Sequence, residues 1–435
     1  MPIRLRTADP LFERAFAGFL TEKREASEDV NEAVRSILAD VRARGDAALI
    51  ELSARFDRAD LSRVGLRVTS DEIEAAMAAS DPAIVAALTI ARDRILVAHQ
   101  RQKPEPEVRW TDAVGAELGH RWTAVQSVGL YVPGGLASYP SSVLMNAVPA
   151  KVAGVERVVM VVPAPGGEIN PLVLAAARLA GVDEIYRVGG AQAVAALAYG
   201  TSTIAPVAKI VGPGNAYVAA AKRQVFGMVG IDSIAGPSEV LIIADRDNDP
   251  EWIAADLLAQ AEHDTAAQSI LMTDDATLAN EVEAAVVRQL AELPKAAIAG
   301  ESWRTFGAVI LLGSLDEAPP LADRIAAEHL EIATADPERL SGRIRNAGAI
   351  FLGKLTPEVI GDYVAGSNHV LPTARSARFS SGLGVLDFMK RTSLLSLNAG
   401  ALAILGPTAM ALARAEGLEG HRNSVAIRLQ PRDRS

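Results

Sequence analysis

The chain has 435 residues, 49% of them hydrophobic but only 4% aromatic, and a net charge of −10. A core of Ala, Val, Leu and Ile is typical of an α/β protein, and the length indicates about two or three domains. The acidic charge and the lack of a basic cluster argue against nucleic acid or an anionic membrane surface as a partner. The absence of cysteine excludes disulfides, thiolate zinc sites and cysteine-based oxidation of aldehydes.

Neither a signal peptide nor an apolar run of about 18 residues is visible in the sequence, so we expect a cytoplasmic enzyme. Residues 1–25 are expected to form a helical arm, whose aromatic side chains can be buried only by docking on something larger. From residue 30 to 102 the apolar periodicity predicts helices, with a break at Gly45 and a new start at Ser80-Asp81-Pro82. Residues 108–128 alternate weakly around two glycines, which predicts a hairpin.

Strands and helices alternate from Gly129 onward, which indicates βαβ units and parallel sheets. The first series is expected to have strands at 158–162, 185–188 and 209–211 and helices at 172–179, 191–199 and 215–226. The second is expected to have strands at 240–244, 269–273, 309–312 and 349–352 and helices at 251–263 and 278–293. The end of the chain is expected to hold a packed helix pair at 399–413 and a final strand at 425–429.

This pattern predicts an α/β fold with two Rossmann-like parallel-sheet domains. They are expected to be incomplete, because no G-x-G-x-x-G sequence occurs. The expected domains are an N-terminal helical arm at 1–25, a first α/β domain at 26–128 plus 239–381, a second at 129–238, and a C-terminal tail at 382–435.

Two turns that follow strands are candidate ligand loops. Gly129-Leu-Tyr-Val-Pro-Gly-Gly135 leads into a helix whose free N–H groups suit an anion, and Tyr131 could stack on a flat ring. An ordinary strand–turn–helix joint explains this sequence about as well. Val211-Gly-Pro-Gly-Asn215 also joins a strand to a helix, where Asn215 either caps the helix or binds a ligand.

The segment Gln260-Ala-Glu-His-Asp264 is a candidate metal site. Gln260 and His263 are three residues apart and would share one face of a helix. An amide oxygen and an imidazole nitrogen suit a cation such as zinc, although a solvated helix end would carry the same residues. Ser238, in the turn before a strand, either offers a hydroxyl at the rim of the sheet or only stabilises the turn.

Glu328 and His329 form an adjacent acid and imidazole. Neighbours on a regular helix diverge by about 100°, so both reach one pocket only if the helix ends there. Such a pair suits general acid–base chemistry, and the alternative is again a solvated helix end. Other polar candidates lie in loops and near the C-terminus, whereas His99 and His120 are assigned to structure. These further candidates are Asp362, His369, Glu416 and His421.

Taken together, the motifs resemble those of the histidinol dehydrogenase family over nearly the whole chain. The matching segments are Tyr131–Gly135, Tyr139–Asn146, Val211–Asn215, Ala235–Glu239, Gln260–Asp264, Ala327–His329, Gly366–His369 and Glu416–His421. The resemblance implies NAD-linked oxidation of L-histidinol through L-histidinal to L-histidine, the last steps of histidine biosynthesis. It also implies one zinc ion (Zn2+) per subunit, which would orient the substrate.

The resemblance implies roles for individual residues of this chain. His329 would be the general acid–base, and Glu328 would activate the water that hydrates the aldehyde. The zinc ligands, which would also contact substrate, would be Gln260, His263, Asp362 and His421. Further substrate contacts would be Ser238, His329, His369 and Glu416, and the NAD contacts would be Tyr131, Gln192 and Asn215.

Members of this family are homodimers that exchange terminal segments, so Glu416 and His421 would complete the site of the partner subunit. Two positions depart from the family's pattern: Leu136 stands where several members have a hydroxyl, and Val155 replaces a cysteine of some members. Without any thiol, the aldehyde must be held non-covalently or on another group.

Three alternatives stay open at the level of sequence. The first is a relative that oxidises another primary alcohol, such as a sulfonated diol. The second is an inactive binding protein on the same scaffold, against which the intact pair of Glu328 and His329 argues. The third is a zinc hydrolase, which would need no nicotinamide.

Overall fold

The computed structural model describes residues 2–21, 28–134, 139–234 and 236–430. Contacts divide the chain into two units, the first made of residues 1–102 and 126–388 and the second of residues 103–125 and 389–435. The four domains expected from the sequence divide the chain at other boundaries and stay a prediction.

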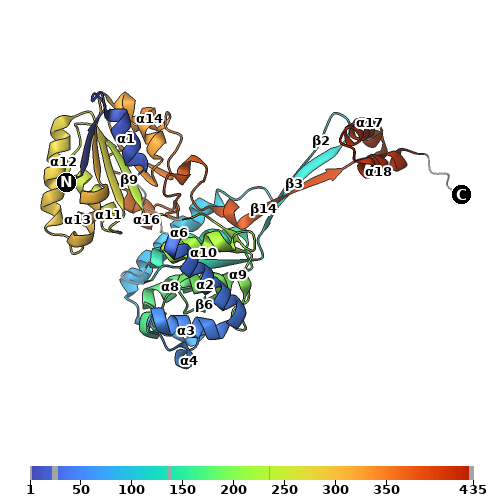
Figure 1. The fold of residues 1–435 in the computed structure, drawn as a ribbon, viewed down its shortest axis with the longest axis horizontal. Helices are drawn as coiled ribbons and strands as arrows, with labels where there is room; N and C mark the ends of the chain where they lie inside the picture. Colours follow the sequence, from blue (N-terminus) through green and yellow to red (C-terminus); the bar gives the residue numbers. More distant parts are fainter. Residues whose placement is uncertain (1, 22–27, 135–138, 235, 431–435) are drawn as a thin grey trace. The chain divides into compact units, whose positions relative to one another are not determined.

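The larger sheet of the first unit has six strands, all parallel, in the order β1-β11-β10-β9-β12-β13 (Figure 1). These strands are β1 (Ile3–Arg6), β9 (Glu239–Ala244), β10 (Gln268–Thr273), β11 (Ala308–Leu311), β12 (His329–Ala333) and β13 (Ala349–Leu352). Strands β9, β10 and β12 are buried at every position, as expected for parallel strands covered on both faces.

Helices cover both faces of this sheet. One face packs against α11 (Pro250–Ala261), α12 (Ala276–Leu290) and α13 (Ala296–Phe306). The other packs against α1 (Phe12–Thr21), α14 (Ala318–Ile325) and α15 (Pro337–Ser341). Local sequence fixes where α11 begins, because Asp249 accepts a hydrogen bond from the N–H of Glu251 and Pro250 occupies the first turn.

The second sheet of this unit has five parallel strands in the order β6-β5-β4-β7-β8. They are β4 (Ser127–Tyr131), β5 (Arg157–Val161), β6 (Glu184–Tyr186), β7 (Lys209–Val211) and β8 (Gly230–Ile231). One core holds β4, β5 and β7 with α2 (Glu28–Arg44), α3 (Asp46–Phe56), α9 (Gly190–Tyr199) and α10 (Ala216–Val225). The remaining helices of this region include α5 (Ser70–Ala79), α6 (Pro82–Gln100), α7 (Pro140–Ala153) and α8 (Pro171–Ala180), which contact one another.

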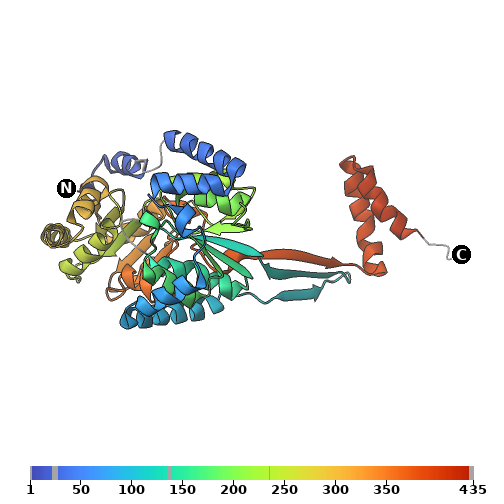
Figure 2. The same cartoon turned by 90° about the horizontal axis from the view of Figure 1, so that it is seen from below.

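The second unit combines an antiparallel sheet with two helices. The sheet order is β14-β3-β2, from β2 (Glu107–Thr111), β3 (Glu117–Ala124) and β14 (Met389–Ser396). Helices α17 (Ala399–Ala415) and α18 (Glu419–Leu429) pack on each other (Figure 2).

Several local predictions are confirmed. Both large sheets are parallel and their strands alternate with helices, so the α/β fold class is correct. Gly45 separates α2 from α3 with a positive φ of 57°, and the Asp81 side chain caps α6 ahead of Pro82. The hairpin near 108–128 is formed by β2 and β3.

Other local predictions are wrong. The arm at 1–25 is not purely helical, because β1 joins the edge of the large sheet beside β11. The expected strand at 425–429 belongs to helix α18, where Val425 and Leu429, one turn apart, both face Gly406 of α17. Residues 399–413 form one continuous helix with Pro407 inside it, and its packing partner is α18.

Strand β12 was not predicted. All of its residues are buried, as in the neighbouring strands. Its sequence nevertheless carries His329 and Glu331 among the apolar residues, so it lacks the uninterrupted apolar run of those strands. Among the residues described, no single helix is long and apolar enough to cross a membrane, and the bent pair α5 and α6 meets that test only by length and composition.

Candidate active site

Glu328 and His329 lie where β12 begins, beside the start of β9. Helix α14 ends at Ile325, and Ala326, with a φ of 50°, turns the chain toward the strand. The pair therefore occupies a helix-to-strand joint, which corrects the expectation of a helix end. In the parallel pairing of β12 with β9, His329 stands opposite Val240. The carboxylate of Glu328 accepts a hydrogen bond of 2.9 Å from the N–H of Glu239.

The imidazole of His329 is almost completely buried and has acidic partners at both ring nitrogens. Its Nε2 lies 3.2 Å from Oδ1 of Asp362. Its Nδ1 lies 3.3 Å from the carbonyl oxygen of Glu239, 3.6 Å from Oε2 of Glu358 and 3.7 Å from Oε2 of Glu328. Glu358 and Asp362 both belong to helix α16 (Glu358–Tyr363). Glu358 belongs to none of the motifs recognised in the sequence and was not predicted as a site residue.

These contacts set the protonation of the group. Burial disfavours the charged imidazolium, but the charges of Glu358 and Glu328 and the hydrogen bond with Asp362 outweigh it and raise the pKa of His329 well above its usual value. Burial raises the pKa of Glu328 to about 7 and that of Glu358 to about 8, and the charge of His329 partly opposes both shifts. Burial by itself would raise the pKa of Asp362, but the hydrogen bond with His329 and the charges of the neighbouring imidazoles together outweigh it and lower that pKa.

His369 is joined to the same group through Asp362. Its Nδ1 donates to the backbone carbonyl of Asp362 at 2.9 Å, because a carbonyl can only accept. Its Nε2 then accepts from the hydroxyl of Ser142 at 3.2 Å, near the start of α7. Burial lowers the pKa of His369, which agrees with this neutral form. The predicted substrate residue His369 therefore does lie beside the predicted metal ligand Asp362.

Gln260 is fully buried near the end of α11, and neither its Oε1 nor its Nε2 has a hydrogen-bond partner among the described residues. Buried amides are nearly always paired, so this amide needs a ligand. His263 lies beyond the last residue of the helix, Ala261, and is joined to Gln260 by a backbone hydrogen bond of 3.3 Å. The expected shared helical face is thus replaced by a turn.

Gln260, His263 and Asp362 are donors of the types that zinc accepts, and they belong to α11, the turn after it and the contacting helix α16. Burial lowers the pKa of His263, and the negative charge of Asp362 opposes part of this shift. The two side chains therefore interact electrostatically. An unpartnered amide, an imidazole and an ionised carboxylate are oxygen and nitrogen donors that zinc accepts. Across the described ranges, no three His, Asp or Glu side chains are already arranged to hold a metal ion. That statement does not cover the predicted ligand Gln260, which is an amide. The predicted ligand Asp362 is hydrogen-bonded to His329 instead.

Glu416 and His421 belong to the second unit. Glu416 follows the last residue of α17 and His421 lies in the first turn of α18, and both side chains are exposed. Their participation in the site stays a prediction. Ser238 lies directly before β9, partly buried, and its carbonyl accepts a hydrogen bond of 3.0 Å from Gln268.

The predicted cofactor residues gather at the carboxyl ends of the second sheet. The Tyr131 ring belongs to the hydrophobic core, so it does not offer the free face that stacking would need. Its hydroxyl accepts a hydrogen bond of 3.0 Å from the N–H of Gly190, and burial raises its pKa to about 12. Gln192, also buried, follows in the first turn of α9. Of the two departures from the family pattern, Leu136 lies outside the described residues and Val155 is buried.

Asn215 caps helix α10. Its Oδ1 accepts from the N–H groups of Tyr217 at 3.0 Å and Val218 at 3.2 Å, so capping is confirmed and the amide nitrogen remains for a ligand. Gly212, at the start of this turn, has a φ of 107°, and a Cβ there would lie 2.2 Å from the carbonyl oxygen of Tyr131. The two predicted loops are therefore in contact, and only glycine fits between them.

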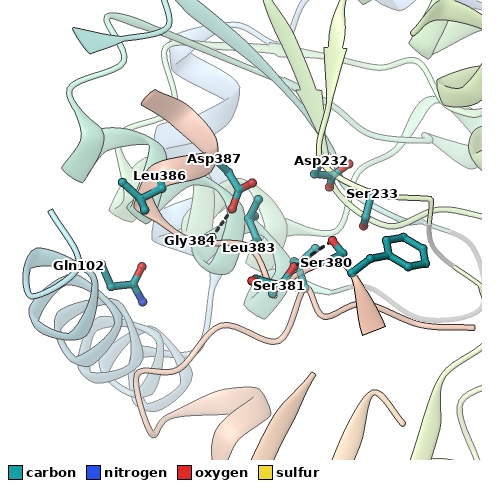
Figure 3. A pocket seen from close by; sticks show the side chains of 12 residues that line it. Gln102, Asp232, Ser233, Ser380, Ser381, Leu383, Gly384, Leu386 and Asp387 are labelled. Carbon is teal, nitrogen blue, oxygen red and sulfur yellow. Dashed lines mark hydrogen bonds between the residues drawn. The ribbon is translucent and has the colours of Figure 1, made fainter. Parts of the chain in front are cut away.

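A pocket of about 560 Å3 lies beside this turn within the first unit. Figure 3 shows Asp232 and Ser233 on one of its walls and Gly384 and Asp387 on another. Asp232 also accepts a hydrogen bond of 2.7 Å from the N–H of Gly212. None of the predicted site residues lines this pocket.

Comparisons with known proteins agree with one another. A family model described as histidinol dehydrogenase matches residues 20–429. A curated histidinol dehydrogenase of Rhizobium meliloti (strain 1021) is 70% identical, covering 99% of each chain, and one of Brucella suis biovar 1 (strain 1330) is 69% identical, covering 99% of this chain and all of its relative. A crystal structure of histidinol dehydrogenase from Elizabethkingia anophelis has a TM-score of 0.93 at 35% identity and covers 98% of each chain. The chain belongs to the histidinol dehydrogenase family of oxidoreductases.

Proposed function

We propose that this protein oxidises L-histidinol through L-histidinal to L-histidine, reducing two NAD per turnover, as the last steps of histidine biosynthesis. Membership of the family supports the substrate. The observation that carries the proposal is the buried imidazole of His329, held between Asp362 on Nε2 and acidic groups on Nδ1. In its neutral form this imidazole can remove an alcohol proton while hydride leaves for the cofactor, and the acidic groups around it stabilise the imidazolium that results.

The first oxidation uses His329. The hydroxyl proton of histidinol moves to the imidazole, the carbon–hydrogen bond breaks, and its electron pair goes to NAD as hydride. The product is the aldehyde, NADH and one proton on the enzyme. Burial of the ring strengthens the electrostatic interactions of the imidazole during this step.

The second oxidation uses Glu328 first. Its carboxylate takes a proton from water, whose oxygen adds to the aldehyde carbon, while the proton held by His329 passes to the aldehyde oxygen to give a hydrate. A pKa of about 7 matches a general base that works near neutral pH. Hydride then leaves the hydrate for a second NAD while a hydroxyl proton of the hydrate passes to His329. The resulting carboxylic acid loses its remaining proton to solvent, which gives the carboxylate of histidine. The fixed contact between Glu328 and the N–H of Glu239 keeps this base at the start of β9.

Gln260, His263, Asp362 and His421 would hold one zinc ion per subunit. Bound zinc would act as a template for the substrate. The unpartnered amide of Gln260 is the feature of this chain that supports the assignment. Ser238, His369 and Glu416 would contact the substrate, and Tyr131, Gln192 and Asn215 would bind NAD. The protein would act in the cytoplasm as a homodimer with exchanged terminal segments, so that Glu416 and His421 reach the partner's site.

The test is an assay of purified protein for histidinol-dependent NADH formation, with zinc measured before and after chelation. We expect two NADH per L-histidinol consumed, loss of activity on chelation, and its return with zinc. Turnover of another primary alcohol but not of L-histidinol would contradict the substrate assignment. Zinc-dependent hydrolysis without NAD, or ligand binding without any turnover, would replace the proposal by one of the other classes.

A further inference from the structure

Glu358 is a buried carboxyl group that the steps above do not use. Only 2% of this residue is exposed, and its Oε2 has no hydrogen-bond partner in the part of the chain that the structure describes. That oxygen instead lies 3.6 Å from Nδ1 of His329. A buried carboxyl without compensation is costly, so its partner is expected to matter.

One helix supplies an acidic side chain to each nitrogen of the imidazole. Glu358 and Asp362 are four residues apart in α16, which places them on the same face of the helix. Glu358 faces Nδ1 and Asp362 faces Nε2. A base whose second nitrogen is held by a carboxylate is a recurring arrangement, in which the carboxylate fixes the orientation and tautomer of the ring.

Packing fixes α16 against the strand that carries His329. The N–H of Glu358 donates to Oε1 of Glu331 in β12 at 2.6 Å. A Cβ on Gly361 would lie 2.5 Å from the ring of Phe351, so the helix approaches β13 very closely. The rings of Phe351 and His329 lie 6.0 Å apart between centroids, and the imidazole is thus confined on one side by an apolar ring.

We propose that Glu358 is the positioning residue for His329, holding the Nδ1 edge of the ring so that Nε2 stays directed to the side of Asp362, where zinc and substrate would bind. The inference rests on the proposed function, in which Asp362 also serves as a zinc ligand. Unlike Asp362, Glu358 binds neither metal nor substrate in that function. Glu358 can therefore hold the imidazole through the whole catalytic cycle.

Glu331 provides a matched control. It is a buried carboxyl on β12 that supports the backbone of α16 through Glu358, and none of its hydrogen bonds or ion pairs involves His329. If Glu358 acted only by supporting α16, Glu358→Gln and Glu331→Gln would have the same consequences. A positioning role predicts that they differ.

The test compares both variants as full-length enzyme. We expect Glu358→Gln to lower kcat for L-histidinol about 100-fold with KM for histidinol, KM for NAD and zinc content near those of the wild type, and Glu358→Asp to recover part of the loss. Glu331→Gln is expected to keep kcat within about threefold of the wild-type value. Weaker support of α16 would then not explain the loss of kcat in Glu358→Gln. Equal losses in the two glutamine variants, or an unchanged kcat in Glu358→Gln, would overturn the inference.

A second readout does not depend on turnover. In protein labelled with 15N-histidine, the ring nitrogens of His329, assigned with His329→Asn, should shift in Glu358→Gln and stay unchanged in Glu331→Gln. Failure of the proposed function would be recognised separately, because the wild type would then form no NADH with histidinol. An unchanged His329 spectrum in Glu358→Gln would reject the positioning role in either case.

Discussion

Lys222 and Asp232 form a buried ion pair, and both side chains hold the backbone of Gly212. Nζ of Lys222 donates to the carbonyl of Gly212 at 3.0 Å, and Asp232 accepts from its N–H at 2.7 Å. The pair thus fixes the turn that leads to Asn215. Because a buried ion pair adds little net stability compared with apolar residues, its value is expected to lie in the shape of this turn.

We therefore expect Lys222→Met to lower the free energy of unfolding by about 3 kcal/mol, since it leaves Asp232 unpaired. It should also raise KM for NAD about tenfold without changing KM for histidinol. Arg157→Met is the control: Arg157 is paired with Glu184 on neighbouring strands of the same sheet but does not contact this turn. Arg157→Met should lower the free energy of unfolding without changing KM for NAD. A normal KM for NAD in a folded Lys222→Met enzyme would contradict the prediction.

His329→Asn should lower kcat by about 10³-fold or more, because the base for both hydride transfers is lost. Zinc content should be unchanged, since His329 is not one of the proposed ligands. Steady-state NADH formation and metal analysis measure the two effects. His120→Asn, in strand β3 of the second unit, is the matched histidine control and should retain activity. A fully active His329→Asn enzyme would remove the assigned role.

Glu328→Gln should impair the second oxidation more than the first. The wild-type enzyme is expected to release about two NADH per histidinol consumed. The variant should release closer to one NADH per histidinol and accumulate the aldehyde. Burial raises the pKa of Glu328 to about 7, and the carboxylate is the active form. The rate with histidinal as substrate should therefore rise with pH through about 7, and this rise should be absent in the variant. An identical pH profile in both enzymes would argue against the role.

Gln260→Leu should affect zinc affinity and protein stability in different ways. Removal of a buried amide without partners should leave the metal-free protein equally stable or more stable, because an uncompensated polar group is replaced by an apolar one. Zinc affinity should fall at least about tenfold. The control is Gln268→Leu, whose buried amide does donate to the carbonyl of Phe306, so that stability should fall while zinc affinity is kept. Unchanged zinc affinity in Gln260→Leu would exclude this residue as a ligand.

The carboxyl pair of Asp256 and Glu331 should make stability depend on pH. Burial raises the pKa of Asp256 to about 6, partly opposed by its hydrogen bond with Glu331, and burial with the charge of Asp256 raises the pKa of Glu331 well above its usual value. A folded pKa above the unfolded one favours the protonated form, so this contribution is complete below about pH 4 and is lost as pH rises through about 6. Asp256→Asn should therefore stabilise the protein by about 1–2 kcal/mol at pH 8 and have little effect at pH 4.

Urea unfolding at both pH values measures this difference. The exposed carboxyl of Glu292 supplies the control, because Glu292→Gln should change stability little at either pH. A destabilised Asp256→Asn protein at the higher pH would show that the ionised pair supports the fold.

Much of the local structure follows from neighbouring residues in the sequence. The cap at Asp81, the break at Gly45 and the cap at Asn215 depend on hydrogen bonds or dihedral angles within a few residues, so the sequence predicts them correctly. Elements whose burial depends on distant partners were harder to predict. Strand β12 is one example, because its acidic residue Glu331 is buried by contacts with Asp256 and α16.

The amino-acid sequence by itself determined the fold class and the family, because periodicity, caps and short motifs are local properties of the chain. Only the tertiary structure decided that Glu358 faces His329, that Gln260 is left without a partner, and that the ring of Tyr131 lies in the core. The reason is physical: these relationships depend on how strands and helices far apart in the chain pack, and no local pattern records that packing.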